Sequence, residues 1–479
     1  MSQLYIGTFV DTPFVGELRI RVNHLMEVSK EGYITHIDSL NSESSQLLLL
    51  NSTDTSNLPM EIGNHSFFLP SFIDLHIHSA QYLFNGTGLN LPLLEWLSKY
   101  AYKSESTIDS NPELAEKVYE KLVDRLLRNG TGCISAFGTI GVEANLILAR
   151  KMQEAGLRGF VGKVSMDQSP SSTYGESSVS TSISTLTQFL DSLEEYLSTF
   201  ESHERLIQPI ITPRFVPVCS EKLLIELKKL SDKRNIRIQS HMCEGRDQID
   251  MVWKKTGKKD HEYWDESGFL GPKTLQAHVT YLEDEMIPLI KEKQVTIAHC
   301  PLSNAYLSER QFPLREAIDN SLSVGLGTDI AGGYSPSIQT QMRQAVIISR
   351  MREGTRCESM KCSFSQSMQK EHHDLSGSKG LGSSLSVNWI ESLYLATRGG
   401  KKGMGLGGFF DIGTEFDAQL IELASKDTST GTGPLDLFSL PPIENQLDEH
   451  SWEDYIEVWW CNGDDRNRKG MWTQGRRVL

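Results

Sequence analysis

The feature that most constrains the fold is an alternation, from Pro70 onwards, of short apolar, β-branched runs with longer amphipathic stretches. Buried parallel strands have near-continuous apolar runs, and amphipathic stretches between them are typical of crossover helices. Eight such runs follow one another: residues 72–78, 132–138, 159–165, 209–215, 236–242, 275–280, 295–301 and 323–329. Eight strand-then-helix units predict an α/β fold, a (β/α)8 TIM barrel, over residues 67–406.

The segments on either side of the barrel are expected to form one small domain. Residues 1–66 contain the short alternating runs LYIGTFV, GELRIRV, HLMEVS and YITHID, with a polar loop near residues 41–57. Residues 407–479 return to β character in EFDAQLIEL, YIEVWW and MWTQGRRVL. Because neither segment is long enough for a core of its own, we expect a composite β-sandwich built from both. Residues 353–386 are rich in Ser and Gly, which predicts a flexible insertion.

Charge and composition limit the partners that the chain can have. The net charge is −15 over 479 residues, whereas binding of a nucleic-acid backbone relies on clustered Lys and Arg. The longest aliphatic run, residues 47–50, is far shorter than a membrane span, and the first residues lack a basic leader followed by an apolar core. Seven scattered cysteines favour reduced thiols over a disulfide framework. We therefore expect a cytoplasmic protein that acts on a small molecule and binds no nucleic acid and no membrane.

Side chains that can bind a metal stand at the ends of several predicted strands. His76 and His78 end the first strand, and residues two apart on a strand point to the same face. His241 ends the fifth strand, His278 lies on the sixth and Asp329 ends the eighth. Because the active site of such a barrel lies at the carboxyl ends of its strands, we expect these side chains to converge. Three histidines and one aspartate suit a divalent ion, with zinc favoured.

These motifs resemble the amidohydrolase superfamily, and within it the ATZ/TRZ-like group. The resemblance rests on FIDLHIHSAQ, ITPRF, IQSHMCEGRD, IAHCPLSN and GLGTDIAGG, and it extends from about residue 70 to the C-terminus. It implies a hydrolase that acts on a C–N bond of a cyclic amidine, removing ammonia from a purine base with an activated water. It also implies one Zn²⁺ per subunit, with Fe²⁺ as an alternative, and a homodimer.

The resemblance further implies a role for each site residue. Four residues would bind the metal: His76, His78, His241 and Asp329. Three would be catalytic, with Glu244 moving protons and the other two holding and activating the attacking water: Glu244, His278 and Asp329. Seven would contact the substrate: His78, Gln81, Arg214, Phe215, His241, Glu244 and Asp329. Asp74, next to the histidines, is expected to be structural.

The chemistry of the individual residues agrees with these implied roles. An arginine such as Arg214 offers fixed donors to a ring carbonyl, and Phe215 offers a face for stacking. Glu244 lies three residues after a metal-ligand candidate, where an acid–base group can reach a ring nitrogen. Two alternatives remain open. One keeps this chemistry for another purine, a pterin or a triazine, and the other is a metal-free scaffold protein of the same family.

Overall fold

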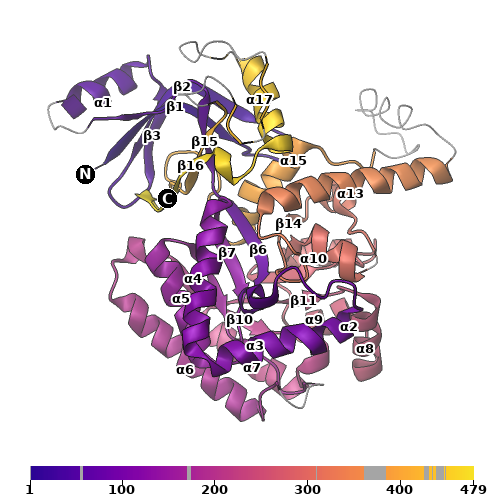
Figure 1. Ribbon diagram of the computed structural model, residues 1–479. Helices are drawn as coiled ribbons and strands as arrows, with labels where there is room; N and C mark the ends of the chain where they lie inside the picture. The colour runs from indigo at the N-terminus through magenta and orange to yellow at the C-terminus, as the bar shows by residue number, and fades with distance from the viewer. Residues whose placement is uncertain are drawn as a thin grey trace.

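A barrel of parallel strands forms the larger body of the protein (Figure 1). A computed structural model describes residues 2–53, 58–169, 174–308, 310–360, 384–424, 431–433, 435–438, 447 and 449–479. Eight strands run side by side in the order β14-β13-β12-β11-β10-β8-β7-β6, each parallel to its neighbour. Beyond β14, the Asp329 amide donates to the His76 carbonyl at 2.8 Å, so the last strand segment meets the first. The predicted (β/α)8 fold is confirmed.

The barrel strands begin and end close to the predicted runs. Their bounds are β6 (Phe72–His78), β7 (Thr131–Phe137), β8 (Arg158–Gly162), β10 (Ile207–Pro213), β11 (Arg237–Met242), β12 (Thr274–His278), β13 (Thr296–His299) and β14 (Ser323–Leu326). The predicted third run is divided, because β9 (Val164–Ser165) pairs separately with the end of β10. Nearly all side chains of these strands are buried, as expected for a sheet covered on both faces.

Helices surround the barrel. The longer ones are α4 (Pro112–Arg128), α5 (Val142–Ala155), α6 (Val179–Ser198), α7 (Glu221–Arg234), α8 (Arg246–Thr256), α9 (Asp260–Glu266), α10 (Ile287–Lys293), α12 (Leu314–Asp319) and α13 (Ile338–Ser359). In α4, the Asn111 side chain caps the first turn by accepting from the Leu114 amide, with Pro112 at the first helical position. Residues at helical spacing, such as Leu122 and Leu126, are buried against the barrel. None of the described helices is long and apolar enough to cross a membrane.

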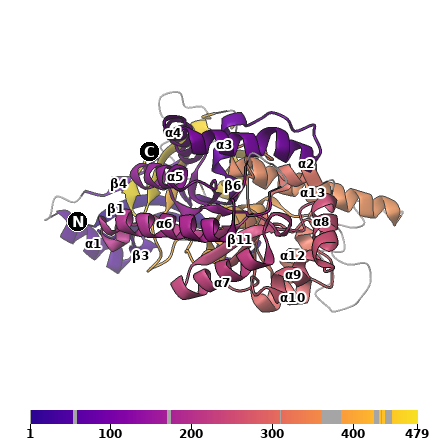
Figure 2. The ribbon, with the colours of Figure 1, turned by 90° about the horizontal axis from the view of Figure 1, so that it is seen from below.

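A group of short elements lies over the carboxyl ends of the strands, the face seen from below in Figure 2. After β6 come η1 (Ser79–Phe84), α2 (Leu93–Trp96), η2 (Leu97–Ala101) and α3 (Tyr102–Ser110). Shorter turns elsewhere are η3 (Ser202–Glu204), η4 (Val216–Val218), α11 (Pro301–Ser303), η5 (Asn304–Ser308), α15 (Trp389–Tyr394), η6 (Leu395–Gly399), α16 (Gly400–Gly403) and η7 (Asp465–Asn467). The helix α3 runs across the front of the barrel in Figure 1.

The two terminal segments together form the second, smaller body, but their described strands belong to one sheet rather than to the two packed sheets of the predicted β-sandwich. Its strands are β1 (Gln3–Asp11), β2 (Arg19–Val28), β3 (Ile34–Ser39), β4 (Met60–Glu61), β5 (Ser66–Pro70), β15 (Ala418–Glu422), β16 (Arg468–Thr473) and β17 (Arg476–Arg477). They pair as one mixed sheet in the order β17-β16-β15-β5-β1-β2-β3, with β4 on β1. Strand β5 joins the halves, because it is parallel to β1 and antiparallel to β15.

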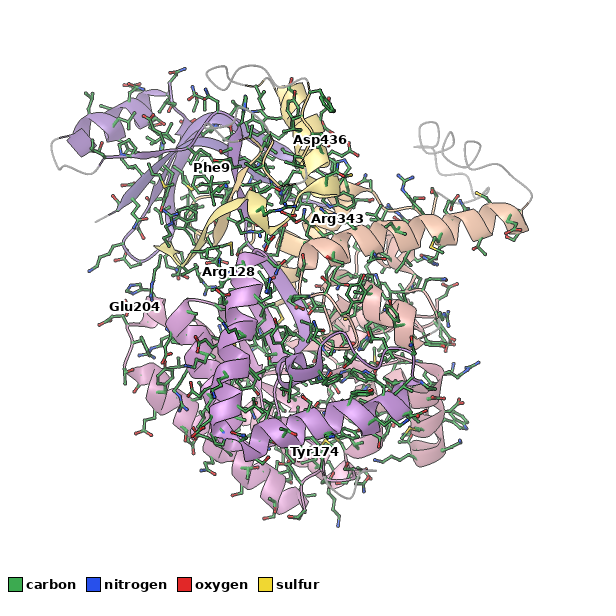
Figure 3. The ribbon with its side chains drawn as sticks, viewed as in Figure 1. Phe9, Arg128, Tyr174, Glu204, Arg343 and Asp436 are labelled. Atoms are coloured by element: carbon green, nitrogen blue, oxygen red, sulfur yellow. The ribbon has the colours of Figure 1, made fainter. Side chains whose placement is uncertain are left out.

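The sheet domain lies against the end of the barrel where the strands begin. The Arg158 side chain, at the start of β8, donates to the Asp417 carboxylate at 2.9 Å, and both are buried. Arg468 of β16 donates to the backbone carbonyl of Arg128, which Figure 3 labels at the junction of the two bodies. The opposite end of the barrel therefore remains available for a site.

Three stretches differ from the expected secondary structure. The predicted loop at residues 41–57 contains the helix α1 (Glu43–Thr53). The run YIEVWW lies in the helix α17 (Glu449–Asn462), where the buried Trp452, Ile456 and Trp459 follow helical spacing rather than alternation. The runs GELRIRV and HLMEVS form one strand, β2. In the predicted insertion, residues 353–359 belong to α13 and residues 361–383 lie outside the described part of the chain.

Candidate active site

Three histidines meet at the carboxyl ends of the barrel strands. His76 and His78 point from the end of β6 to the same place, and His241 reaches it from β11. The Nε2 atoms of His78 and His241 are 3.1 Å apart. The ring centres of His76 and His241 are separated by 4.8 Å. These three side chains form one cluster in which the nitrogen atoms can bind a single ion.

Asp329 and His278 complete the cluster from the next strands. One Asp329 carboxylate oxygen, Oδ1, lies 3.2 Å from His76 Nε2 and 3.6 Å from His78 Nε2. The other, Oδ2, lies 3.9 Å from His278 Nε2. His278 and Asp329 have positive φ angles of 69° and 48°. Left-handed backbone is unfavourable for such residues and is concentrated at functional sites, so the fold holds both side chains inward at some cost.

The protonation states of the histidines fit a bound cation. Burial holds the pKa of His76, His78 and His241 well below the ordinary value, so all three rings are neutral. His241 Nδ1 lies 2.6 Å from the Arg214 carbonyl, and a donor at Nδ1 leaves a lone pair on Nε2, where it faces His78. Neither ring nitrogen of His76 has a hydrogen-bond partner among the described residues. Converging nitrogen lone pairs beside a carboxylate are the donor set that a divalent metal requires.

Two buried residues support this cluster from behind. The Phe137 ring packs within 4.9 Å, centre to centre, of the rings of His76, His78 and His241. The Asp74 carboxylate accepts from the backbone amides of Thr328 and His76, at 2.9 and 3.1 Å. Asp74 thereby connects the segment after β14 to β6. This contact is structural, as the sequence analysis expects for Asp74.

Glu244 follows β11 and lies next to the cluster. Its Oε1 atom is 3.7 Å from His278 Nε2. Burial and the nearby charge of Asp329 raise the pKa of Glu244 to about 8, although Arg214 acts in the opposite direction. A carboxyl group with such a pKa can both accept and release a proton near neutral pH. His278 is oriented by Asn304, because its Nδ1 lies 3.0 Å from Asn304 Oδ1.

The remaining predicted residues border a small cavity in front of the cluster. Its polar wall consists of His78, Gln81, Arg214, His241, Glu244, Gln248 and Asp329, and its apolar wall of Leu93, Leu94, Trp96, Leu97, Phe215 and Leu307. The cavity volume is about 30 Å³, so the cavity is small in this structure. Most of its apolar wall belongs to the short segment formed by α2 and η2.

All nine predicted site residues thus lie together, and the structure adds others that the motifs did not indicate. Phe137 and Asn304 contact the histidines, and Glu105 of α3 is hydrogen-bonded to both Gln81 and Arg214. Asn304 belongs to the motif IAHCPLSN, so its place after the seventh strand was a usable signal. Glu105 lies on a helix far from any strand end, and no spacing in the sequence identifies it.

Comparison with known proteins agrees with this geometry. The sequence model of the Amidohydrolase family matches residues 67–451. Guanine deaminase of Dictyostelium discoideum is 33% identical over 99% of this chain and 98% of its own length. Guanine deaminase of Homo sapiens is 33% identical over 100% of this chain and 97% of its own length. The crystal structure of guanine deaminase from C. acetobutylicum, with bound guanine in its active site, has a TM-score of 0.81 at 26% identity and covers both chains fully.

The fold and the metal-binding cluster define a barrel hydrolase of the metal-dependent type. The chain belongs to the amidohydrolase family, and within that family it groups with the guanine deaminases. The sequence motifs already resemble guanine deaminase in particular, and this prediction is confirmed.

Proposed function

We propose that this chain catalyses the hydrolytic deamination of guanine to xanthine and ammonia in purine catabolism or salvage. One observation carries the proposal: the metal-binding cluster, the acid–base group Glu244 and the polar residues Gln81 and Arg214 border one cavity. They do so in a chain that aligns over its full length with guanine deaminases. The reaction consumes one water and replaces the exocyclic amine of guanine by a carbonyl.

We assign one divalent ion per subunit to His76, His78, His241 and Asp329. Three neutral imidazoles and a carboxylate favour Zn²⁺, and Fe²⁺ is the alternative because imidazole also suits iron. When bound, such an ion lowers the pKa of water towards neutrality and supplies the nucleophile. This assignment is supported by the converging Nε2 atoms and by the depressed pKa of the histidines.

His278 and Asp329 hold the attacking water between them and orient it towards the amine-bearing carbon. Asp329 accepts a proton from the water, and the hydrogen bond of His278 to Asn304 keeps the imidazole facing the same point. Glu244 gives a proton to the ring nitrogen beside that carbon and regains one from the added hydroxyl as the new carbonyl forms, while the proton held by Asp329 goes to the leaving amine. Its pKa of about 8 suits both transfers.

The substrate contacts place the purine ring against the polar wall of the cavity. Arg214 and Gln81 donate to the ring carbonyl, and Phe215 packs against the ring face. His78, His241, Glu244 and Asp329 border the edge that carries the reacting carbon. Gln81 and Arg214 are almost fully buried, so neither side chain has to exchange many water contacts when the purine binds.

Cellular and assembly properties are proposed from the sequence. A cytoplasmic location is supported by six free cysteines among the described residues, since reduced thiols persist there. We further propose a homodimer, no nucleic-acid or membrane partner, and a division of the chain into 1–66, 67–406 and 407–479. Analytical ultracentrifugation of the purified protein tests the dimer.

An assay of purified protein tests the function directly. Guanine consumption and xanthine formation are followed by ultraviolet absorbance, beside adenine, a pterin and a triazine, and the metal content is measured on the same sample. Guanine turnover with about one zinc or iron per chain is expected. Consumption of another substrate with guanine untouched would refute guanine as the substrate. Absence of stoichiometric metal, with no turnover after adding zinc or iron, would favour a scaffold protein.

A further inference from the structure

A buried carboxylate on α3 holds the two polar groups that we assign to the purine carbonyl. Glu105 Oε2 accepts from Arg214 Nη1 at 2.6 Å, and Glu105 Oε1 accepts from Arg214 Nη2 at 2.9 Å. The same Oε1 atom accepts from Gln81 Nε2 at 3.0 Å. Glu105 is fully buried and does not border the cavity. It therefore lies behind Gln81 and Arg214 and acts on them rather than on a ligand.

The contacts of Arg214 fix both its charge and its plane. A bidentate pair between arginine and a carboxylate restricts the orientation of the guanidinium group. The Tyr102 ring lies 5.0 Å from Arg214 Cζ, and Tyr174, labelled near α3 in Figure 3, packs against Tyr102 with ring centres 6.0 Å apart. Burial lowers the pKa of Arg214, but Glu105 and Tyr102 together raise it above the ordinary value. Arg214 is thus a permanent cation whose charge is balanced inside the protein.

The amide of Gln81 is held at both ends. Its Nε2 donates to Glu105, and its Oε1 accepts from the Ala331 amide at 3.1 Å. Two of the five N–H groups of Arg214 donate to Glu105, and the other three have no acceptor among the described residues, so they can donate to a ligand. The Glu105 carboxylate therefore fixes the direction of the remaining N–H donors on both Arg214 and Gln81.

We propose that Glu105 is a positioning residue that makes the site selective for purines with a carbonyl at the six-position. This inference rests on the proposed function. With Glu105 in place, Arg214 and Gln81 present preoriented donors to the carbonyl oxygen without an excess positive charge. Without it, Arg214 is free to turn and its charge is unbalanced, and a carbonyl purine loses its advantage over a purine that lacks the carbonyl.

Binding of two unreactive purines tests the inference. Hypoxanthine carries the carbonyl and purine itself does not, and the ratio of their dissociation constants is measured by calorimetry for the zinc-loaded wild type and Glu105→Gln. Loss of oriented, charge-assisted hydrogen bonds is expected to reduce the preference for hypoxanthine by about ten- to a hundredfold. KM for guanine should rise more than kcat falls, and the metal content should not change.

Glu176→Gln is the matched control. Glu176 forms another buried ion pair, with Lys163 at 2.6 Å, and neither residue borders the cavity. This variant is expected to lower the melting temperature without changing the hypoxanthine preference. If Glu105→Gln lowers only the melting temperature and leaves the preference intact, Glu105 is merely structural and the proposal is wrong.

A double-mutant cycle shows whether Glu105 acts through Arg214. In an Arg214→Gln background, Glu105→Gln should have a much smaller further effect on the preference, because only Gln81 is left for Glu105 to position. Additive effects would contradict the inference. If Glu105→Gln does not fold, Glu105→Asp, which keeps the charge at a shorter reach, should show a smaller loss of preference, and an unchanged preference would refute the proposal. A wild type that neither deaminates guanine nor prefers hypoxanthine would instead refute the proposed function.

Discussion

Replacing Glu244 with glutamine separates proton transfer from metal binding. Glu244 is 3.7 Å from His278 and belongs to neither of the groups of side chains that can hold a metal. Glutamine has nearly the same volume, so it leaves the cavity wall in place, but it cannot accept or release a proton. We therefore expect Glu244→Gln to bind its metal normally and to lose most of its turnover.

The size of the loss follows from the role of the residue. General acid–base catalysis contributes about 10²- to 10⁴-fold to a rate, which corresponds to about 3–5 kcal/mol of activation free energy. At pH 7.5, a carboxyl group with a pKa of about 8 is present in both protonation states in comparable amounts, and glutamine removes both. The decrease should be in kcat, with the affinity for hypoxanthine changed little.

The stability of the metal-free protein gives an independent check. The pKa of Glu244 rises from 4.5 to about 8 on folding. The folded chain therefore binds more protons than the unfolded chain between these values, and stability falls as the pH rises through them. Glu244→Gln removes this loss of stability at high pH. The metal-free variant should therefore be at least as stable as the metal-free wild type at pH 9.

Steady-state kinetics with guanine, metal analysis by mass spectrometry and thermal unfolding at pH 6 and pH 9 test these expectations. A kcat within tenfold of the wild-type value, with normal metal content, would refute the proton path assigned to Glu244. Loss of the metal would show instead that Glu244 is needed for the metal site itself.

Three further predictions concern the metal, the carboxylate that supports its ligands, and the junction between the barrel and the sheet domain. Removal of the metal with dipicolinate should abolish turnover and leave the circular dichroism unchanged, and added Zn²⁺ should restore activity, because the barrel core does not depend on the ion. Asp74→Ala leaves two buried backbone amides without an acceptor, which should cost about 1–3 kcal/mol each in urea unfolding and weaken metal binding. Asp417→Asn should cost about 3–5 kcal/mol in urea unfolding at pH 7, because it leaves the buried Arg158 unpaired. Burial raises the pKa of Asp417, but Arg158 and Lys401 together lower it below its ordinary value of 3.8, so this difference should persist above pH 4 and shrink only as the pH falls below it.

Much of the fold could be predicted because parallel barrel strands have a strong local signal. Strands such as β6 and β12 are buried along their whole length, and each ends in a histidine at the carboxyl end of the barrel. The weaker predictions lie where two periodicities compete. Five of the six residues 455–460 are aromatic or β-branched, which favours a strand, but the burial of Trp452, Ile456 and Trp459 on one face stabilises a helix.

The sequence by itself determined which side chains stand at the strand ends, and hence the candidate set His76, His78, His241, His278 and Asp329. The alternation of side chains along a strand is a local property, so it can be counted along the chain. Only the tertiary structure decided what surrounds that set. Glu105 reaches Gln81 and Arg214 because α3 folds back over the strand ends, and the small cavity is closed by α2 and η2. Such contacts depend on the packing of segments that are distant in sequence, and no spacing along the chain records them.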